Sequence, residues 1–445
     1  MSENRNKWYK LDNVAKIVPC TEAGTDNRVF RLVCELKEEV DPEMLQQALD
    51  HTMQEFPHFN VYMKKGFFWY YLKESRERAA VYEDNLPACS EIYIPGRRNL
   101  LFRVNYYKKR INVEMYHALS DGTGAFEFLK AIVLRYLGAK YNLTDEQLEW
   151  STASVREKKD DAFGRFYQKQ KDQGLIPKVS SANTKAWHIR GERDENIKLH
   201  LLEGTLSVGS FLEKARAYHT TLAVLATSIL IESIIKEMRM RDHRYPVVIA
   251  VPVNLRNYFP SNTTRNFFGV IDVIYHPVNY KGSLEDIIPS VRKSFQEELT
   301  EEKIFQSMNS YSALENNIGI QMAPLIIKDL VVAGFNKSRK KEVTMTLSNV
   351  GKVNMPAAVT PYINKFASFM AAEDMQICIS SFEDKLVFGV TSAFRNHEIM
   401  MHFFRRMTEM GIDVELSTSD FNTEPGTETR STRDETGDGD AFHLQ

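Results

Sequence analysis

The stretch INVEMYHALSDGTGAFEFLKAIVLRYL (Ile111–Leu137) carries two different hydrophobic periods, one on each side of a short turn. Up to His117 the apolar residues alternate, which is typical of a β-strand, and after Gly124 they recur at helical spacing. The residues between these two points are rich in small side chains. The sequence therefore predicts a strand, a tight turn and a helix, with His117 ending the strand and Asp121 near the start of the helix.

His117 shares one face of the predicted strand with apolar residues, whereas Glu114 belongs to the opposite face. A neutral imidazole at the interior end of a strand can accept a proton near pH 7, which is what a weak nucleophile needs. The alternative is a buried histidine beside an ordinary helix cap at Asp121. A metal site of Glu114, His117 and Asp121 is disfavoured, because Glu114 points away and no second histidine is close. We predict no metal.

The composition excludes several classes of function. The 445 residues exceed the usual size of one hydrophobic core, and a formal net charge of -2 offers no basic field for nucleic acid. The 4 cysteines lie far apart, the start of the chain lacks the apolar stretch of a signal peptide, and the longest apolar run, 222–231, is too short for a transmembrane segment. We expect a cytoplasmic protein with two lobes and no transmembrane segment.

The pattern of helices and strands predicts a mixed α/β fold. A strand at Arg28 precedes a helix capped by Asp41, and the segments LFRVNYY and INVEMYH predict an antiparallel hairpin. Charged residues dominate from 151 to 196, where the crossover between lobes is expected. The predicted domains are residues 1–165, 166–415 and a disordered acidic tail, 416–445. Further strands and helices are expected as follows: strands in IKLHLLEG, YPVVIAVPVNL, FFGVIDVIYH, EVTMTLSNV, NKFASFMAA, MQICISSF and KLVFGVTSAF, and helices at 207–219, 220–238, 284–299, 323–337 and 397–410.

Three segments together resemble a known superfamily. His117-Ala-Leu-Ser-Asp121-Gly122 resembles the H-x-x-x-D-G motif of the chloramphenicol-acetyltransferase-like superfamily, which includes alcohol acetyltransferases, condensation domains and plant BAHD acyltransferases. VPVNLRNYF (251–259) and TLSNVG (346–351) are similar to further elements of these families. The opening WYKLDNVAKIVP is also similar, so that the resemblance covers residues 8 to 412.

The resemblance implies two similar α/β lobes with a tunnel between them and His117 near its middle as the general base. Asp121 is then structural and pairs with an arginine, for which Arg256 is the candidate. Gly122 would let a pantetheine arm pass close to the backbone. Asn266, Ser348 and Asn349 offer donors that could line the tunnel or meet an oxyanion, although hydrogen bonding at strand ends explains them equally well.

The function implied is transfer of an acyl group from acyl-CoA to a small hydroxyl or amine acceptor, as in an alcohol O-acetyltransferase, without an acyl-enzyme. No G-x-S-x-G elbow is present. One alternative is a condensation-type ester or amide former whose donor is a phosphopantetheine thioester on an acyl or peptidyl carrier protein. Another is a binding module of the same fold that has lost turnover. No tightly bound cofactor is expected, only the thioester as donor substrate.

Overall fold

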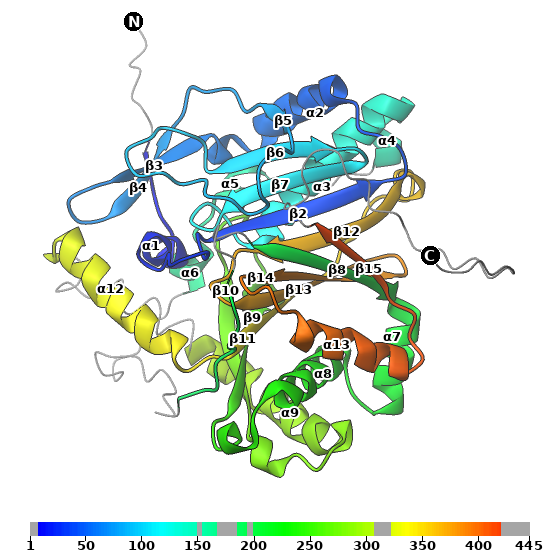
Figure 1. The fold of residues 1–445 in the computed structure, drawn as a ribbon. Coiled ribbons are helices and arrows are strands. Elements are labelled where there is room, and N and C mark those ends of the chain that lie inside the picture. The colour runs from blue at the N-terminus through cyan, green and yellow to red at the C-terminus, as the bar shows by residue number, and fades with distance from the viewer. Residues whose placement is uncertain (1–7, 149–153, 167–184, 194–198, 307–321, 420–445) are drawn as a thin grey trace, which may run out of the picture.

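The computed structural model describes residues 8–148, 154–166, 185–193, 199–306 and 322–419 (Figure 1). Strands in these ranges form three sheets, and helices cover them on the outside. The fold is therefore mixed α/β, as the sequence predicts. No single helix among the described residues is long and apolar enough to cross a membrane. Only the pair α7 (Val208–Ala217) and α8 (Leu222–Glu237), taken together, passes that test of length and composition, and the two helices are bent by 81° relative to each other.

The first lobe is built on a five-stranded sheet. Its order is β12 (Ile363–Met370), β2 (Val29–Leu36), β7 (Arg110–Tyr116), β6 (Phe102–Tyr107) and β5 (Val81–Glu83). All neighbours are antiparallel except β5 and β6. The predicted hairpin is β6 and β7, in register at Val104 opposite Val113. Helices α2 (Pro42–Glu55) and α3 (Gly122–Tyr141) pack together, and α3 contacts β2 and β7.

Beside this sheet lies a small one, β1 (Trp8–Lys10), β4 (Tyr70–Glu74) and β3 (Val61–Lys65). Phe67 and Phe68 lie in the turn between β3 and β4. The short helices of the described chain are α1 (Asn13–Ile17), α4 (Asp145–Leu148), α5 (Val155–Lys158) and α6 (Ala162–Phe166), with 3-10 turns including η1 (Val18–Cys20) and η4 (Leu255–Asn257).

The second lobe is built on a seven-stranded sheet. Its order is β10 (Phe268–Tyr275), β9 (Val247–Asn254), β11 (Met345–Lys352), β13 (Met375–Phe382), β14 (Lys385–Ser392), β8 (His200–Ser207) and β15 (Glu415–Ser419). Only β11 is parallel to its neighbours. The helices of this lobe are α7 (Val208–Ala217), α8 (Leu222–Glu237), α9 (Leu284–Glu298) and α13 (Glu398–Glu409). A further helix, α12 (Leu325–Lys340), lies at the edge of the molecule (Figure 1).

The local sequence explains where α2 begins and why α8 is buried. Asp41 caps α2, and its side chain accepts hydrogen bonds from the backbone N–H groups of Glu43 and Met44 at 2.9 and 3.0 Å. The apolar run that starts at Leu222 is buried continuously between Val224 and Ile235, in contact with α9 and α13. Both were predicted from the sequence, and both are present.

The sheets do not follow a single division of the chain near residue 165. Strand β12, from the C-terminal half, pairs antiparallel with β2 and forms an edge of the first-lobe sheet. On β12, Lys365 lies 2.6 Å from Glu203 of β8, which Arg110 of β7 also contacts at 3.0 Å. These charges connect the two large sheets. About half of the expected crossover at 151–196 lies outside the described residues.

The end of the second lobe differs from the prediction. The tail was expected to begin at 416, but residues 415–419 form β15, which pairs with β8 from Glu415 opposite Thr205 to Ser419 opposite Leu201. This strand, ELSTS, is almost entirely polar, so no alternation of apolar residues marks it in the sequence, and the groups that stabilise it are backbone N–H and C=O. The remaining tail, 420–445, lies outside the described residues.

Removal of β15 should destabilise the protein. A chain that ends at Val414 loses the hydrogen bonds to β8, each worth about 0.5–1.5 kcal/mol net, so its free energy of unfolding should fall by about 1–3 kcal/mol. A chain that ends at Ser419 keeps the strand and serves as the control. Urea denaturation of both chains and the full protein measures the difference, and equal stability of the two truncated chains would mean that β15 contributes nothing.

Candidate active site

His117 follows directly after β7, at the border between the two lobes. Its backbone N–H donates to the carbonyl of Arg28 at 2.9 Å, which fixes the end of the strand. The imidazole is partly buried between two aromatic rings, one from each lobe: the ring centroids of Phe30 and Phe268 lie 5.3 and 5.4 Å away. The side chain predicted to act as a base is therefore held between residues of both lobes.

Asn266 of the second lobe determines which nitrogen of His117 carries the proton. The Asn266 Nδ2 group donates to the carbonyl oxygen of His117 at 3.0 Å and to Asp12 Oδ2 at 3.2 Å. Since a carbonyl oxygen can only accept, the amide oxygen of Asn266 must face His117 Nδ1, 3.0 Å away. Nδ1 therefore holds the hydrogen, and Nε2 keeps the lone pair that a base requires.

The surroundings also keep the imidazole neutral. Burial lowers the pKa of His117 below its ordinary value. A hydrogen bond between the ring and the backbone of His117 itself, the charge of Asp121 and the hydrogen bond to Asn266 oppose this shift only in part. The neutral form consequently persists to a lower pH than in a free histidine. A neutral imidazole with a free lone pair on Nε2 can remove a proton from a hydroxyl or an amine.

Asp121 is buried and caps α3. Its Oδ1 atom accepts the backbone N–H of Gly124 at 2.9 Å and Arg256 Nη2 at 3.2 Å, while Oδ2 accepts Arg256 Nη1 and the backbone N–H of Phe267, both at 2.8 Å. Four donors thus surround one carboxylate, which is what a buried charge requires. Three of these donors come from the second lobe, so that Asp121 ties α3 to that lobe.

Arg256 lies in η4, directly after β9, and contacts Asp121 as expected. Its remaining N–H groups donate to backbone carbonyls of the loop that follows: Nε and Nη2 to Thr263 at 3.1 and 3.0 Å, and Nη2 to Arg265 at 2.7 Å. The guanidinium therefore shapes the loop that carries Asn266. A lysine could not replace this planar set of donors.

The two glycines of the turn have different surroundings. A Cβ atom on Gly122 would meet nothing within 4 Å, whereas one on Gly124 would lie 2.1 Å from the backbone oxygen of Thr264. Ser120, fully buried, donates its hydroxyl to the same Thr264 oxygen. Gly124 is therefore needed for the approach of the second lobe, and Gly122 leaves open space on the first turn of α3.

The other predicted residues lie elsewhere or have other partners. Ser348 and Asn349 are on β11, where the Asn349 side chain accepts the backbone N–H of Gly351 at 3.0 Å beside a β-bulge. Both Nδ2 hydrogens of Asn266 are already donated to protein oxygens, so that its side chain orients the base and has no N–H left for an oxyanion. Glu114 faces Arg31 and Arg103 at 2.9 and 2.8 Å, away from His117.

Sequence reasoning missed three residues that hold the site together. Asp12 caps α1 and accepts a hydrogen bond from Asn266, and Gly124 and Thr264 form the close contact between the lobes. Asp12 belongs to the opening segment whose resemblance had been noted, and Gly124 to the turn itself. Both residues therefore stand in segments that the sequence had singled out, but the residues they contact, Asn266 and Thr264, lie more than 130 positions away in the chain.

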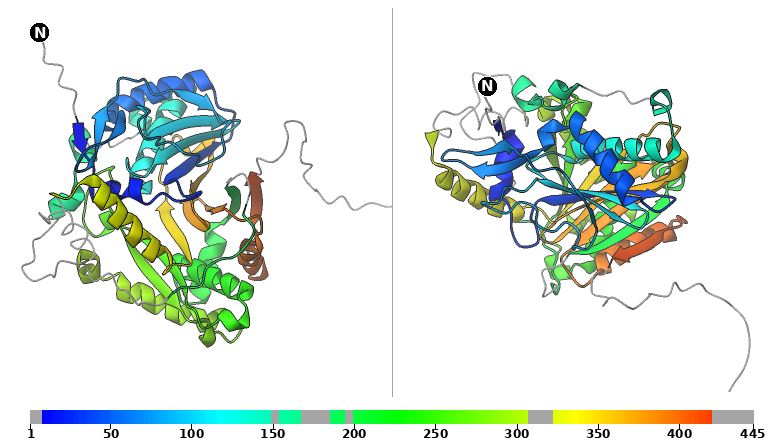
Figure 2. Two further views of the ribbon diagram at one scale, coloured as in Figure 1. Left: turned by 60° about the vertical axis from the view of Figure 1, so that its left-hand side comes forward. Right: turned by 90° about the horizontal axis from the view of Figure 1, so that it is seen from above.

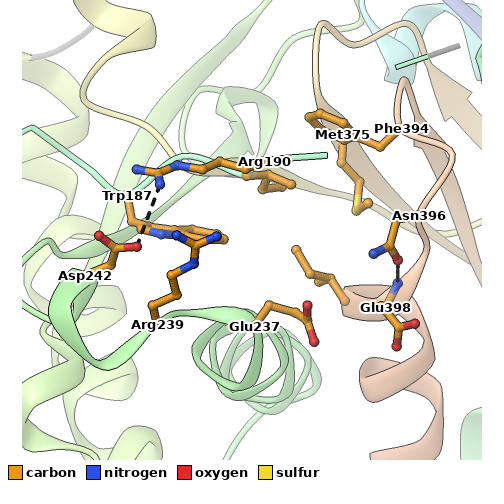
Figure 3. Close-up of a pocket in the computed structure, with 11 residues that line it drawn as sticks. Trp187, Arg190, Glu237, Arg239, Asp242, Met375, Phe394, Asn396 and Glu398 are labelled. Atoms are coloured by element: carbon orange, nitrogen blue, oxygen red, sulfur yellow. Dashed lines mark hydrogen bonds and ion pairs between the residues drawn. The ribbon is translucent and has the colours of Figure 1, made fainter. Parts of the chain in front are cut away.

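A separate pocket of about 150 Å³ lies in the second lobe and shares no lining residue with the surroundings of His117 (Figure 3). Among its labelled side chains, Arg190 reaches toward Asp242, and the backbone N–H of Glu398 donates to Asn396 at 2.7 Å. Glu237 and Glu398, which line this pocket, and the nearby His402 place possible ligand atoms within 4.8 Å of one another. Glu398 is exposed, and this group belongs to no predicted site.

Comparison with known proteins gives structural but not sequence relatives. No protein-family model and no curated protein sequence matches the chain. F. graminearum TRI101, solved with coenzyme A and deoxynivalenol, is similar with a TM-score of 0.62 and 13% identity over 92% of this chain and 99% of that one. Polyketide synthase associated protein 5 from Mycobacterium tuberculosis gives 0.60 and 11%, over 90% and 96% of the two chains.

The first condensation domain of the calcium-dependent antibiotic synthetase is similar to the same degree, with a TM-score of 0.60 and 11% identity over 92% of this chain and 96% of that domain. The chain has the chloramphenicol-acetyltransferase-like fold. This confirms the fold class predicted from the sequence. At these identities the similarity describes the architecture, and the roles of individual residues rest on the geometry given above.

The contact between Asp121 and Arg256 can be tested by a double-mutant cycle. Asp121→Asn and Arg256→Met each leave a buried group without its partner, so that each should lower the free energy of unfolding by about 3–5 kcal/mol. The double variant should lose less than the sum, because the two residues act through one contact. Denaturant melts of the four proteins measure this, and strictly additive losses would show that the pair is not energetically coupled.

Gly124 and Gly122 form a matched pair for substitution. Gly124→Ala should lower the free energy of unfolding by about 1–3 kcal/mol, because the new methyl group meets a backbone oxygen that cannot move aside. This outweighs the gain of about 1 kcal/mol from replacing a helical glycine by alanine. Gly122→Ala, with open space around it, should be neutral or slightly stabilising. Thermal melts compare the two, and equal effects would contradict the close approach of the lobes.

Proposed function

We propose that the protein is an acyltransferase that moves an acyl group from a thioester to a hydroxyl or amine, with His117 as general base. The observation that carries this proposal is the hydrogen bond between His117 Nδ1 and Asn266 Oδ1, which leaves Nε2 as the proton acceptor. The fold, shared with a structure solved in the presence of coenzyme A, supports acyl-CoA as the class of donor.

The proposed reaction is a direct transfer. His117 Nε2 removes the proton of the acceptor O–H or N–H while the acceptor oxygen or nitrogen attacks the thioester carbonyl carbon. A tetrahedral intermediate forms, its C–S bond breaks, and the imidazolium returns the proton to the leaving thiolate. The proton taken from the acceptor ends on the leaving thiol, and no acyl-enzyme is formed. Asp121 and Arg256 keep the turn and the Asn266 loop in place and do not touch the reacting atoms.

Gly122 belongs to the same proposal. Its open side lies on the first turn of α3, one residue after the cap, where a side chain would meet no protein atom within 4 Å. We place the arm of the thioester along this open side. The acyl group and the acceptor would then meet at the His117 imidazole, beside the rings of Phe30 in the first lobe and Phe268 in the second.

Replacement of His117 tests the mechanism. His117→Ala should fold normally, because the imidazole is only partly buried, and should slow the chemical step by about 10²-fold or more. In the unchanged protein the rate should fall on the acid side with a midpoint below about 6.5, because the lowered pKa keeps His117 neutral to a lower pH. Release of free thiol from acyl-CoA, measured against a panel of alcohols and amines, gives both results.

Asn266→Ala is the matched variant for the same assay. It removes a hydrogen bond that raises the pKa of His117, so the acid limb should move to still lower pH while kcat falls and KM changes little. Near-normal turnover by folded His117→Ala would exclude the general base. Thiol release from a carrier-protein thioester but not from acyl-CoA would favour the condensation-type donor.

A further inference from the structure

Helix α12 carries its polar and apolar sides in the reverse of the usual arrangement. Six large apolar side chains on it and just before it are more than half exposed: Met322, Ile326, Ile327, Leu330, Val331 and Phe335. A helix of a globular protein normally turns this stripe toward the core. Contiguous exposed apolar surface of this kind marks a site of interaction with another protein or with a membrane.

The polar side of α12 faces the protein. Asp329 accepts hydrogen bonds from Cys20 Sγ and Lys65 Nζ at 3.0 Å, and from the Tyr70 hydroxyl at 3.2 Å. Lys328 Nζ lies over the Trp69 ring, 3.5 Å from its centroid. These contacts fix the rotation of the helix, because turning its apolar stripe inward would break all of them. The exposed stripe is thus a stable feature of the surface.

Contacts farther along α12 attach it to both lobes. Asn336 Nδ2 donates to the carbonyl of Thr21 at 3.2 Å in the first lobe, and Arg339 Nη2 lies 2.5 Å from Asp272 of β10 in the second. Figure 2 shows the helix lying on the outside of the molecule, across both lobes. The Thr21 carbonyl also accepts Arg28 Nη2 at 3.1 Å, and Arg28 holds the backbone of His117. The exposed helix is therefore close to the candidate active site.

The turn between β3 and β4 extends the apolar surface. Phe67 is 73% exposed and Phe68 42%, and the backbone N–H of Leu325, at the start of α12, donates to the carbonyl of Phe67 at 2.8 Å. Lys65 beside these rings is half exposed. Aromatic rings at the tip of a hairpin, next to lysines, are typical of protein surfaces that enter the interface of a bilayer.

The charges around the stripe select one occupant. Lys337 and Lys341 are exposed at the end of α12, and the only acidic residue in 325–341, Asp329, is turned inward. The α12 of a second copy would offer these lysines no free carboxylate, because Asp329 is already bound to Lys65 and Tyr70 of its own chain. An anionic lipid surface offers the opposite charge and deforms around a protruding helix.

We propose that α12 and the β3–β4 turn form a docking surface for an anionic phospholipid bilayer. The helix lies in the interface with its apolar stripe toward the acyl chains, and it does not span the membrane. Lys337 and Lys341 contact the headgroups. The attraction is strongest at low salt, because exposed charges are screened at high ionic strength.

The test is flotation of the full chain with vesicles of phosphatidylcholine alone or mixed with phosphatidylglycerol. The unchanged protein should bind the mixed vesicles at low salt, and added salt should weaken binding. Ile326→Ser combined with Leu330→Ser should lower the partition coefficient by about tenfold or more. Leu416→Ser, on exposed β15 away from α12 (Figure 1), is the matched control and should bind normally.

Lys337→Ala combined with Lys341→Ala should weaken binding to the mixed vesicles and leave any binding to vesicles of phosphatidylcholine alone unchanged. Thermal melts check that every variant is folded. Absence of vesicle binding by the unchanged protein, or equal binding by the Ile326/Leu330 variant, would overturn the proposal. Light scattering after size-exclusion chromatography is run in parallel, and a dimer that the Ile326/Leu330 variant loses would assign the stripe to a second copy instead.

Discussion

The carboxylate of Asp121 is the point on which the arrangement of the site depends. It caps α3 of the first lobe and accepts three donors from the second, so one buried charge connects the helix, the guanidinium of Arg256 and the start of β10. Removal of a charge from water is costly unless every lone pair finds a donor, and here the donors come from segments far apart in the chain. The lobes must therefore dock before the turn after His117 takes its shape.

The docking of the two lobes also fixes the protonation state of His117. His117 belongs to the first lobe, but the group that chooses its tautomer, Asn266, belongs to the loop that Arg256 holds in the second. The second lobe therefore supplies the amide oxygen that accepts the Nδ1 hydrogen. Burial between Phe30 and Phe268 then keeps that imidazole neutral, so that geometry and protonation state have one common origin in the contact between the lobes.

The sequence predicted the parts of this structure that depend on neighbours along the chain. Alternation placed β7 and helical spacing placed α3, and Asp41 was recognised as a cap because its partners are two and three residues away. The pairing of β12 with β2 was not predictable, since strand partners are chosen across the whole sheet. The same holds for Asn266, whose partners are Asp12 and His117. In α12 the periodicity showed an apolar stripe, but period alone does not tell which side meets solvent.

The position of β12 has a consequence for synthesis of the protein. An edge of the first sheet comes from residues 363–370, so the N-terminal half cannot complete its own sheet while it leaves the ribosome. Until more than four-fifths of the chain has been made, strand β2 presents an unpaired edge, which is the kind of surface on which nascent chains associate wrongly. The first lobe is thus finished late, and the two lobes mature as one cooperative unit whose halves cannot be exchanged as independent modules.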